Sequence, residues 1–245
     1  MSAPLSPAGE GASAGGGLIE APRPTVVLLH GLARTQHSLA GLRRHLERAG
    51  FPTWARGYPS RRLSIAAAAD EIAGWIAADL PADRPLVAVT HSMGGLVVRH
   101  LAARVAFRRI VMLAPPSDGS RVSRAFQGRP LSRRFFRWIF GPAGQELAAP
   151  PEARAWPTLE VPCAVIAGTR ARSLANPTSW LTRAGGYFAP GEPNDGTLAV
   201  AETALPGATA CATVDATHTW IMNDPRAREL VVRFLSGEDD LSPRA

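Results

Sequence analysis

Short aliphatic runs alternate with amphipathic segments along most of this chain, and this alternation restricts the folds that it can adopt. The runs lack the polar alternation of half-exposed strands and are therefore typical of buried strands in a parallel sheet. We predict strands at residues 25–30, 51–56, 86–90, 109–114, 161–168 and 209–214. Apolar residues at helical spacing predict helices at residues 38–49, 65–80, 92–104 and 224–235. This order predicts an α/β fold with a doubly wound, mostly parallel sheet of about six strands.

The chain of 245 residues suits one domain with flexible ends. Residues 1–24 are rich in Gly, Ala, Ser and Pro, so we predict a flexible N-terminal tail there. The predicted domain covers residues 25–236, and residues 237–245 are predicted to form a C-terminal tail. Residues 115–160 and 169–198 break the alternation, and segments of this length are usually lids or binding loops. We expect a lid or cap insertion at residues 115–160.

The sequence has no segment typical of a membrane span or a secretory signal. The longest purely apolar runs, such as residues 26–29 and 110–114, fall far short of the roughly 20 residues that a span needs. The N-terminal tail lacks the apolar block of a signal peptide. We therefore predict a cytoplasmic protein.

The formal net charge is +7, and all 27 basic residues are arginines. No recognised nucleic-acid-binding motif accompanies this charge, so we predict no nucleic-acid partner. Two cysteines, Cys163 and Cys211, lie in strand-like runs. Buried reduced thiols are the favoured interpretation, and a bridge between adjacent strands stays open.

The most informative stretch runs from an apolar strand directly into a helix, through Thr90-His91-Ser92-Met93-Gly94. A serine on such a sharp turn points its hydroxyl out of the sheet, at the edge where parallel sheets collect catalytic groups. Thr90 stands where the pattern G-x-S-x-G has its first glycine. We predict that Ser92 is a nucleophile; the alternative is a structural serine that caps an ordinary helix.

At this point the sequence resembles the α/β-hydrolase superfamily, specifically its small bacterial lipase and esterase branch. The matching pieces are His30-Gly31, residues 90–95, Asp195-Gly196-Thr197 and His218-Thr219-Trp220. The resemblance implies a minimal six-strand form of the fold, because no candidates exist for the two leading antiparallel strands of larger members. It also implies a nucleophile, an acid and a base in the chain order Ser92, Asp195, His218.

Six histidines compete for the role of the base that a serine nucleophile needs. His218 follows the last predicted strand, where a loop returns over the sheet edge, so it is expected to reach Ser92. His30 is expected to shape the oxyanion loop, and His91 lies beside the nucleophile and is expected to face elsewhere. His37, His45 and His100 are expected to be solvated or to form hydrogen bonds with nearby groups.

Asp195 is the predicted acid, which would orient the histidine and stabilise its cation. It follows the fifth predicted strand in the turn-forming sequence 193–197, and a plain structural turn is the alternative. Asp215 is the nearest rival. It precedes His218 by only three residues and is expected at the end of the strand, so its carboxylate is poorly placed to turn back to the histidine. The other aspartates considered are Asp118 in the predicted lid and Asp224 as a helix cap.

Two backbone N–H groups are expected to bind an oxyanion, namely those of Met93 and Leu32. The predicted lid interleaves six arginines with large apolar residues over residues 121–140. Phe135, Phe136 and Trp138 are the predicted substrate-binding residues of this lid, which would shield an acyl pocket and rest on an anionic lipid surface. The alternative is a cap helix packed on the core with a solvated arginine face.

These residues together predict a serine hydrolase that cleaves carboxylic esters through an acyl-enzyme, with a small-molecule or lipid ester as substrate. An acyltransferase or amidase with the same residues is one alternative, and a catalytically silent binding protein of the same fold is another. Neither a cofactor nor a metal is predicted, because acyl transfer needs none and no ligand-like spacing of His and Cys is present. The oligomeric state stays open.

Overall fold

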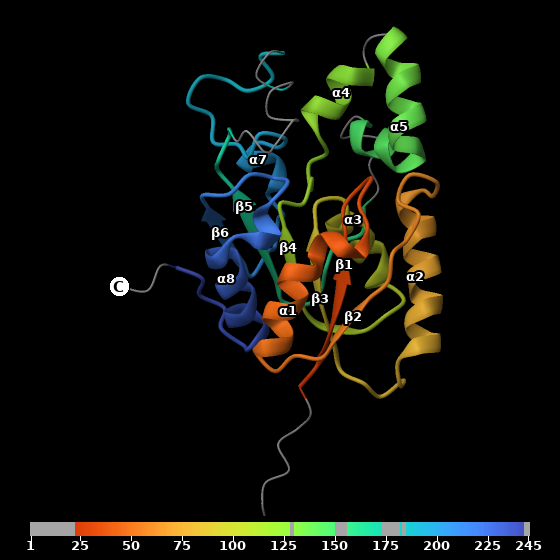
Figure 1. The fold of residues 1–245 in the computed structure, drawn as a ribbon, viewed down its shortest axis with the longest axis vertical. Helices are drawn as coiled ribbons and strands as arrows, with labels where there is room; N and C mark the ends of the chain where they lie inside the picture. The colour runs from red at the N-terminus through yellow and green to blue at the C-terminus, as the bar shows by residue number, and fades with distance from the viewer. Residues whose placement is uncertain (1–22, 128–129, 150–155, 173–181, 183–184, 243–245) are drawn as a thin grey trace, which may run out of the picture.

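The computed structural model has a six-stranded sheet at its centre, with strand order β2-β1-β3-β4-β5-β6 and parallel pairing throughout (Figure 1). It describes residues 23–127, 130–149, 156–172, 182 and 185–242, with the backbone alone at residues 126, 130–137 and 139. The strands are β1 (Thr25–Leu29), β2 (Thr53–Ala55), β3 (Leu86–His91), β4 (Phe107–Leu113), β5 (Cys163–Gly168) and β6 (Ala210–Val214). The predicted parallel α/β sheet is confirmed.

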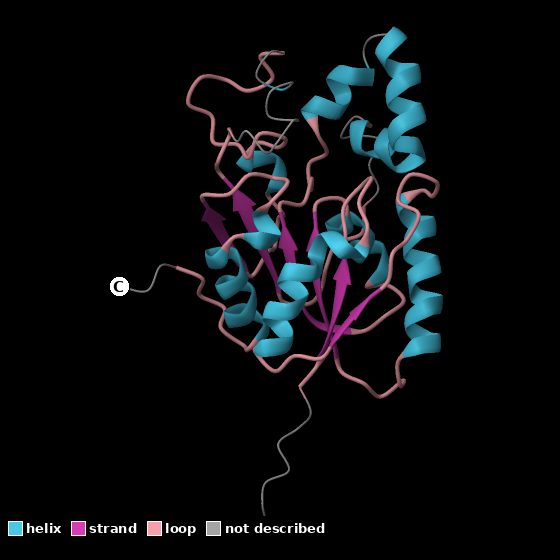
Figure 2. Cartoon of the chain, viewed as in Figure 1, coloured by secondary structure: helices cyan, strands magenta, loops and turns pink. Residues whose placement is uncertain are grey.

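Helices cover both faces of this sheet (Figure 2). The helices are η1 (Gln36–Leu39), α1 (Ala40–Arg48), α2 (Ile65–Asp79), α3 (Gly94–Leu101), α4 (Arg121–Gln127), α5 (Pro130–Ala148), α7 (Val200–Thr203), η3 (Ile221–Asn223) and α8 (Pro225–Leu235). Side chains alternate along β1, so Val26 and Leu28 pack with α1 and α8, whereas Val27 and Leu29 pack with α2 and α3. The molecule therefore has one apolar core on each face of a doubly wound sheet.

Local sequence signals explain where several helices begin and end. Asp224 caps α8, as predicted, by accepting a hydrogen bond from Ala227 N at 2.9 Å. Ser64 caps α2 in the same way, by accepting from Ala67 N at 3.1 Å. Gly50 follows the end of α1 with φ of 84°, a conformation that glycine adopts without steric cost.

The stretch 115–160, predicted as a lid or cap insertion with a cap helix as the alternative, contains the helices α4 and α5 (Figure 1). Both helices lie beyond the carboxyl ends of the strands, and α5 packs beside α2. The Glu146 carboxylate of α5 accepts a hydrogen bond from Ile65 N, the first N–H of α2, at 3.2 Å. At its kink α5 has Gly141 with φ of 62°, where a Cβ would collide with the carbonyl of Arg61. These contacts fix the carboxyl end of α5 against the domain.

The two cysteines are both free, with Cys163 buried on β5 and Cys211 exposed on β6. The expectation of buried reduced thiols is therefore right for Cys163 and wrong for Cys211, because alternate side chains of the edge strand β6 face outward.

Leu241, within the predicted C-terminal tail, is buried against the core that α8 covers. Over the described ranges, no helix combines the length and hydropathy that crossing a membrane requires.

Candidate active site

Ser92 lies at the sharp turn where β3 passes into α3. Its φ of 53° places it in the left-handed region, and its N–H donates to Leu113 O of the neighbouring strand at 2.8 Å. Within the described ranges, the other non-glycine residues with positive φ are Ala33, just after β1, and Ala114, just after β4. Strained backbone of this kind concentrates at functional sites, so these three turns mark the carboxyl edge of the sheet as the candidate site.

Close backbone packing places the turn after β1 directly beside Ser92. A Cβ on Gly94 would lie 2.7 Å from Leu29 O, so only glycine allows α3 to begin this close to β1. A Cβ on Gly31 would lie 3.1 Å from Ser92 Cβ. Thr90, which replaces the first glycine of the pattern, is buried within β3 between Leu29 and Met112. The extra side chain is therefore accommodated in the sheet, before the turn begins.

The structure brings together the serine, histidine and aspartate that the sequence predicted. His218 Nε2 lies 2.9 Å from Ser92 Oγ, and His218 Nδ1 lies 2.7 Å from Asp195 Oδ2. The aspartate is 1% exposed and the histidine 9%, so both hydrogen bonds are shielded from water while the serine stays half-buried. The three side chains form one continuous hydrogen-bonded chain that ends at a hydroxyl.

The loop of residues 192–198, called the aspartate loop below, holds the Asp195 carboxylate in place. Asp195 Oδ1 accepts hydrogen bonds from Thr197 N at 2.9 Å and Leu198 N at 2.7 Å, which leaves Oδ2 for the histidine. Its backbone carbonyl also accepts from His218 N at 3.0 Å. The rival Asp215 instead forms an exposed ion pair with Arg170. The turn interpretation of residues 193–197 is thus correct as well, because the turn is what orients the carboxylate.

The predicted oxyanion donors are backbone groups without partners. In the described part of the chain, neither Leu32 N–H nor Met93 N–H donates a hydrogen bond. Met93 is fully buried, and buried N–H groups without partners are rare in proteins. Two free donors beside a serine hydroxyl are suited to a developing negative charge on a substrate oxygen.

His91 was expected to face elsewhere, but it contacts the predicted base. Its Nε2 donates to the backbone carbonyl of His218 at 2.9 Å, and the two rings lie 5.1 Å apart. The Nδ1 atom is buried without a hydrogen-bond partner. Burial, with smaller contributions from His218 and Arg34, holds the pKa of His91 well below its ordinary value, so the ring is neutral. No local motif signals this role, because the contact joins residues 127 positions apart.

His30 anchors the turn after β1, in agreement with the role expected for it. Its Nδ1 donates to Gly31 O at 2.9 Å, and its Nε2 accepts from Tyr58 N at 3.3 Å. The Tyr58 ring stacks on the imidazole at 4.1 Å, and the Tyr58 hydroxyl donates to His30 O. Burial lowers the pKa of His30, which keeps this tautomer neutral. The loop that carries Tyr58 therefore supports the turn at residues 30–33, called the oxyanion turn below after the donor predicted in it.

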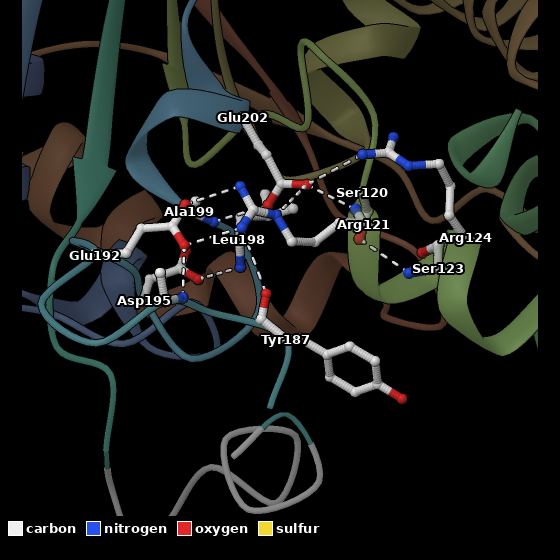
Figure 3. A network of polar contacts seen from close by, with 11 residues as sticks. Ser120, Arg121, Ser123, Arg124, Tyr187, Glu192, Asp195, Leu198, Ala199 and Glu202 are labelled. Atoms are coloured by element: carbon white, nitrogen blue, oxygen red, sulfur yellow. Dashed lines mark hydrogen bonds and ion pairs between the residues drawn. The ribbon is translucent and has the colours of Figure 1, made fainter. Parts of the chain in front are cut away.

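A buried carboxylate joins the aspartate loop to α4 (Figure 3). Glu202 of α7 accepts hydrogen bonds from Arg121 N at 2.6 Å and from Ala199 N at 2.9 Å. It thereby satisfies the N–H of the first residue of α4, 81 positions away in the chain, and the N–H of Ala199, the residue just before α7. The Arg121 guanidinium then pairs with Glu192, near the start of the aspartate loop, at 2.8 Å. No local sequence pattern predicts this network, because its contacts join distant residues.

The three predicted substrate-binding residues all lie on α5. The side chains of Phe135 and Phe136 lie outside the described residues. Trp138 of α5 is 80% exposed. Across the described ranges, no group of three or more His, Cys, Asp or Glu side chains lies close enough to share a metal ion.

A parallel six-stranded sheet with a serine at a strand-to-helix turn, followed in the chain by its aspartate and histidine, defines the α/β-hydrolase class of proteins. A model of the "Alpha/beta hydrolase family" matches residues 26–245. The chain belongs to this family. Comparison with curated protein sequences finds no match.

Solved structures with the same fold include several bacterial enzymes. The mature lipase BlEst2 of Bacillus licheniformis is 16% identical, with a TM-score of 0.64 over 88% of this chain and 93% of that chain. Phospholipase PlaB from Legionella pneumophila is 16% identical, with a TM-score of 0.66 over 89% of this chain and 60% of that chain. The metagenomic carboxyl esterase MGS0156 is 20% identical, with a TM-score of 0.61 over 90% of this chain and 72% of that chain. At these identities the likeness concerns the fold alone.

Proposed function

We propose that this protein is a serine hydrolase that cleaves carboxylic esters through an acyl-enzyme. The observation that carries the proposal is the continuous hydrogen-bonded chain from Asp195 through His218 to Ser92. A serine hydroxyl is a weak nucleophile at neutral pH and becomes effective when a base accepts its proton. A silent binding protein has no need for such an arrangement.

In the proposed reaction, Ser92 Oγ attacks the ester carbonyl while its proton passes to His218 Nε2. The negative charge on the carbonyl oxygen is bound by the N–H groups of Leu32 and Met93. Asp195 stabilises the imidazolium that forms, and the proton then passes to the leaving alcohol as the C–O bond breaks. Water, deprotonated by the same histidine, attacks the acyl-enzyme and releases the carboxylic acid.

We further propose that the substrate is a small-molecule or lipid ester and that α4 and α5 form its cap. Both helices lie beyond the carboxyl ends of the strands (Figure 1), the edge of the sheet at which β3 passes into the turn of Ser92. Among proteins of the same fold are a lipase, a phospholipase and a carboxyl esterase, which supports the choice of ester substrates. Substrate binding by Phe135, Phe136 and Trp138, and contact with an anionic membrane, stay predictions.

Labelling with a fluorophosphonate probe tests the nucleophile directly, because the probe reacts with activated serines. We expect stoichiometric labelling of the folded protein, with the label on the peptide that contains Ser92 and none in a Ser92→Ala variant. Absence of label from a folded sample would contradict the hydrolase and favour the silent binding protein.

A second measurement separates esters from the alternative acceptors and leaving groups. We expect p-nitrophenyl esters to be hydrolysed far faster than matched p-nitroanilides. The amine of an anilide is a poorer leaving group than the phenol of an ester, and an ester hydrolase does not compensate for this difference. Added alcohol should not divert the acyl group from water. Preferred transfer to alcohol would indicate an acyltransferase, and preferred anilide cleavage an amidase.

A further inference from the structure

Arg34 follows the predicted oxyanion donor Leu32 by two residues and is a half-buried cation without a partner among the residues that the structure describes. Within the described ranges, its guanidinium forms no hydrogen bond, ion pair or ring contact. The other half-buried or buried arginines with described side chains all have partners: Arg84, Arg99, Arg109, Arg121, Arg124, Arg226, Arg228 and Arg233. Arg34 is therefore the exception in a chain whose only basic residues are arginines.

Leaving a charge partly desolvated and unpaired destabilises a fold. Burial lowers the pKa of the Arg34 guanidinium, which shows that its surroundings already disfavour the charge. Ala33, the residue before it, holds φ of 57°, so the backbone here is also in an unfavourable conformation for a residue with a side chain. Costs of this kind are typical of sites whose partner is a ligand.

The positive charge of Arg34 acts on two histidines that flank the turn at Gly31 in the candidate active site. Burial is the main cause of the lowered pKa of His30 and His91, the two buried histidines on either side of the turn at Gly31, and the Arg34 guanidinium adds a smaller contribution to both. The turn also holds the free Leu32 N–H. An anion beside the oxyanion turn would therefore lie within the electrostatic reach of this guanidinium.

The chain from residue 30 to residue 64, which includes Arg34, is rich in arginine and almost without acidic residues. Ala33 N donates to Ser60 Oγ at 3.1 Å, which joins the oxyanion turn to the loop that carries the exposed Arg61 and Arg62. Between residues 30 and 64, Glu47 is the only acidic residue, and it is already paired with Arg43. No acidic side chain of this stretch is available to neutralise Arg34.

We propose that Arg34 binds an anionic group of the substrate, a carboxylate or a phosphate, which the substrate carries in addition to its scissile ester. The planar guanidinium suits both anions, since each accepts two parallel hydrogen bonds from it. This inference rests on the proposed ester hydrolase and narrows its substrate class to anionic esters.

Pairs of chromogenic esters that differ only in charge test the proposal. The acyl-side pairs are the 4-nitrophenyl esters of monomethyl glutarate and glutarate, and of methyl-capped and free 4-phosphonobutanoate. The alcohol-side pair is the butyrate ester of 3-carboxy-4-nitrophenol and that of its methyl carboxylate. For each pair the anionic-to-neutral ratio of kcat/KM is compared between the wild type and its variants, which cancels the intrinsic reactivity of the esters.

We expect Arg34→Gln to lower this ratio by about 10-fold or more in at least one pair, as the loss of a charge-assisted hydrogen bond predicts. The pair affected tells which anion, and which side of the ester, Arg34 contacts. Arg34→Lys should restore part of the ratio, which a purely structural role would not do. The matched control is Arg44→Gln, an exposed arginine of α1, which should leave the ratio unchanged.

Each remaining outcome decides one of the two proposals. Hydrolysis of all the esters with the same ratio in the wild type, Arg34→Gln and Arg44→Gln would overturn the anion site and leave the ester hydrolase standing. Failure to hydrolyse any ester, together with no fluorophosphonate label on Ser92, would overturn the hydrolase and this inference with it.

Discussion

His91 holds the backbone of the histidine that serves as base in the proposed reaction. Since its Nε2 donates to the His218 carbonyl, its Nδ1 carries no proton and faces Gly31, where an added Cβ would lie 3.1 Å away. One neutral ring therefore packs between the base and the oxyanion turn. We infer a positioning role for His91, because it touches neither the serine hydroxyl nor the expected place of the substrate.

Replacing His91 with Phe keeps a ring in place but removes the donor, so the buried His218 carbonyl loses its partner. We expect kcat for a p-nitrophenyl ester to fall about 10-fold with little change in KM, as the loss of one buried hydrogen bond predicts. Gln reaches the same carbonyl with its amide N–H, and His91→Gln should recover most of kcat. The exposed His37 supplies the matched control, His37→Phe; a wild-type kcat for His91→Phe would contradict the role.

The difference between Ser92 and Arg34 explains how much of the site could be predicted from the sequence. The serine, the aspartate and the histidine lie in short turns whose residue types encode the local geometry, so they could be identified one turn at a time. The importance of Arg34 lies in the lack of a partner, and that of His91 in a contact between distant residues. A linear pattern contains neither kind of information.

At the scale of elements, Glu202 connects the start of α4 to the loop that holds Asp195 (Figure 3). Glu202→Gln removes the charge and turns an amide N–H toward one of two backbone N–H groups. We expect the free energy of unfolding in urea to fall by about 1–3 kcal/mol, the usual cost of an unsatisfied buried group. Because the aspartate loop is loosened as well, kcat for an ester should also decrease.

The matched control for this prediction is Glu229→Gln on the surface of α8. Glu229 pairs with Arg226 three positions earlier, an exposed helix pair of little energetic weight. Both variants lose one negative charge. A difference between their free energies of unfolding therefore comes from the buried contacts of Glu202 and not from the change in net charge. Equal unfolding free energies for the two variants would show that Glu202 does not connect the two elements.

The elements themselves were predictable to differing degrees. The buried strands of the sheet centre appear within a few residues of their predicted bounds, because an uninterrupted aliphatic run has few other structures available. β4 begins at Phe107, two residues before its predicted start, since Arg108 lies on the strand yet points to solvent. The bounds of α4 and α5 were not predicted, although a cap helix was the alternative for residues 121–140, because arginines and aromatic residues interrupt the helical spacing. The order of both helices depends on contacts with distant segments.

At the scale of the whole molecule, buried neutral histidines should make stability depend on pH. Burial lowers the pKa of His30 and of His91 below the ordinary value of 6.5. The unfolded chain then binds more protons than the fold at mildly acidic pH, so stability is fully present above about pH 6.5 and is lost as the pH falls below it. The carboxylates with lowered pKa act only at lower pH, below about 4.5.

We therefore expect the free energy of unfolding, measured in urea at pH 7.5, 6.5 and 5.5, to fall slightly over the first interval and more steeply over the second. Each buried histidine contributes up to about 1.4 kcal/mol per pH unit below 6.5. His91→Gln removes one of these groups and should flatten the decline, whereas His37→Gln on the surface should reproduce the wild-type slope. A wild-type slope in His91→Gln would mean that His91 takes up its proton within the fold and does not stay neutral there, although its Nε2–H would still donate to His218 O.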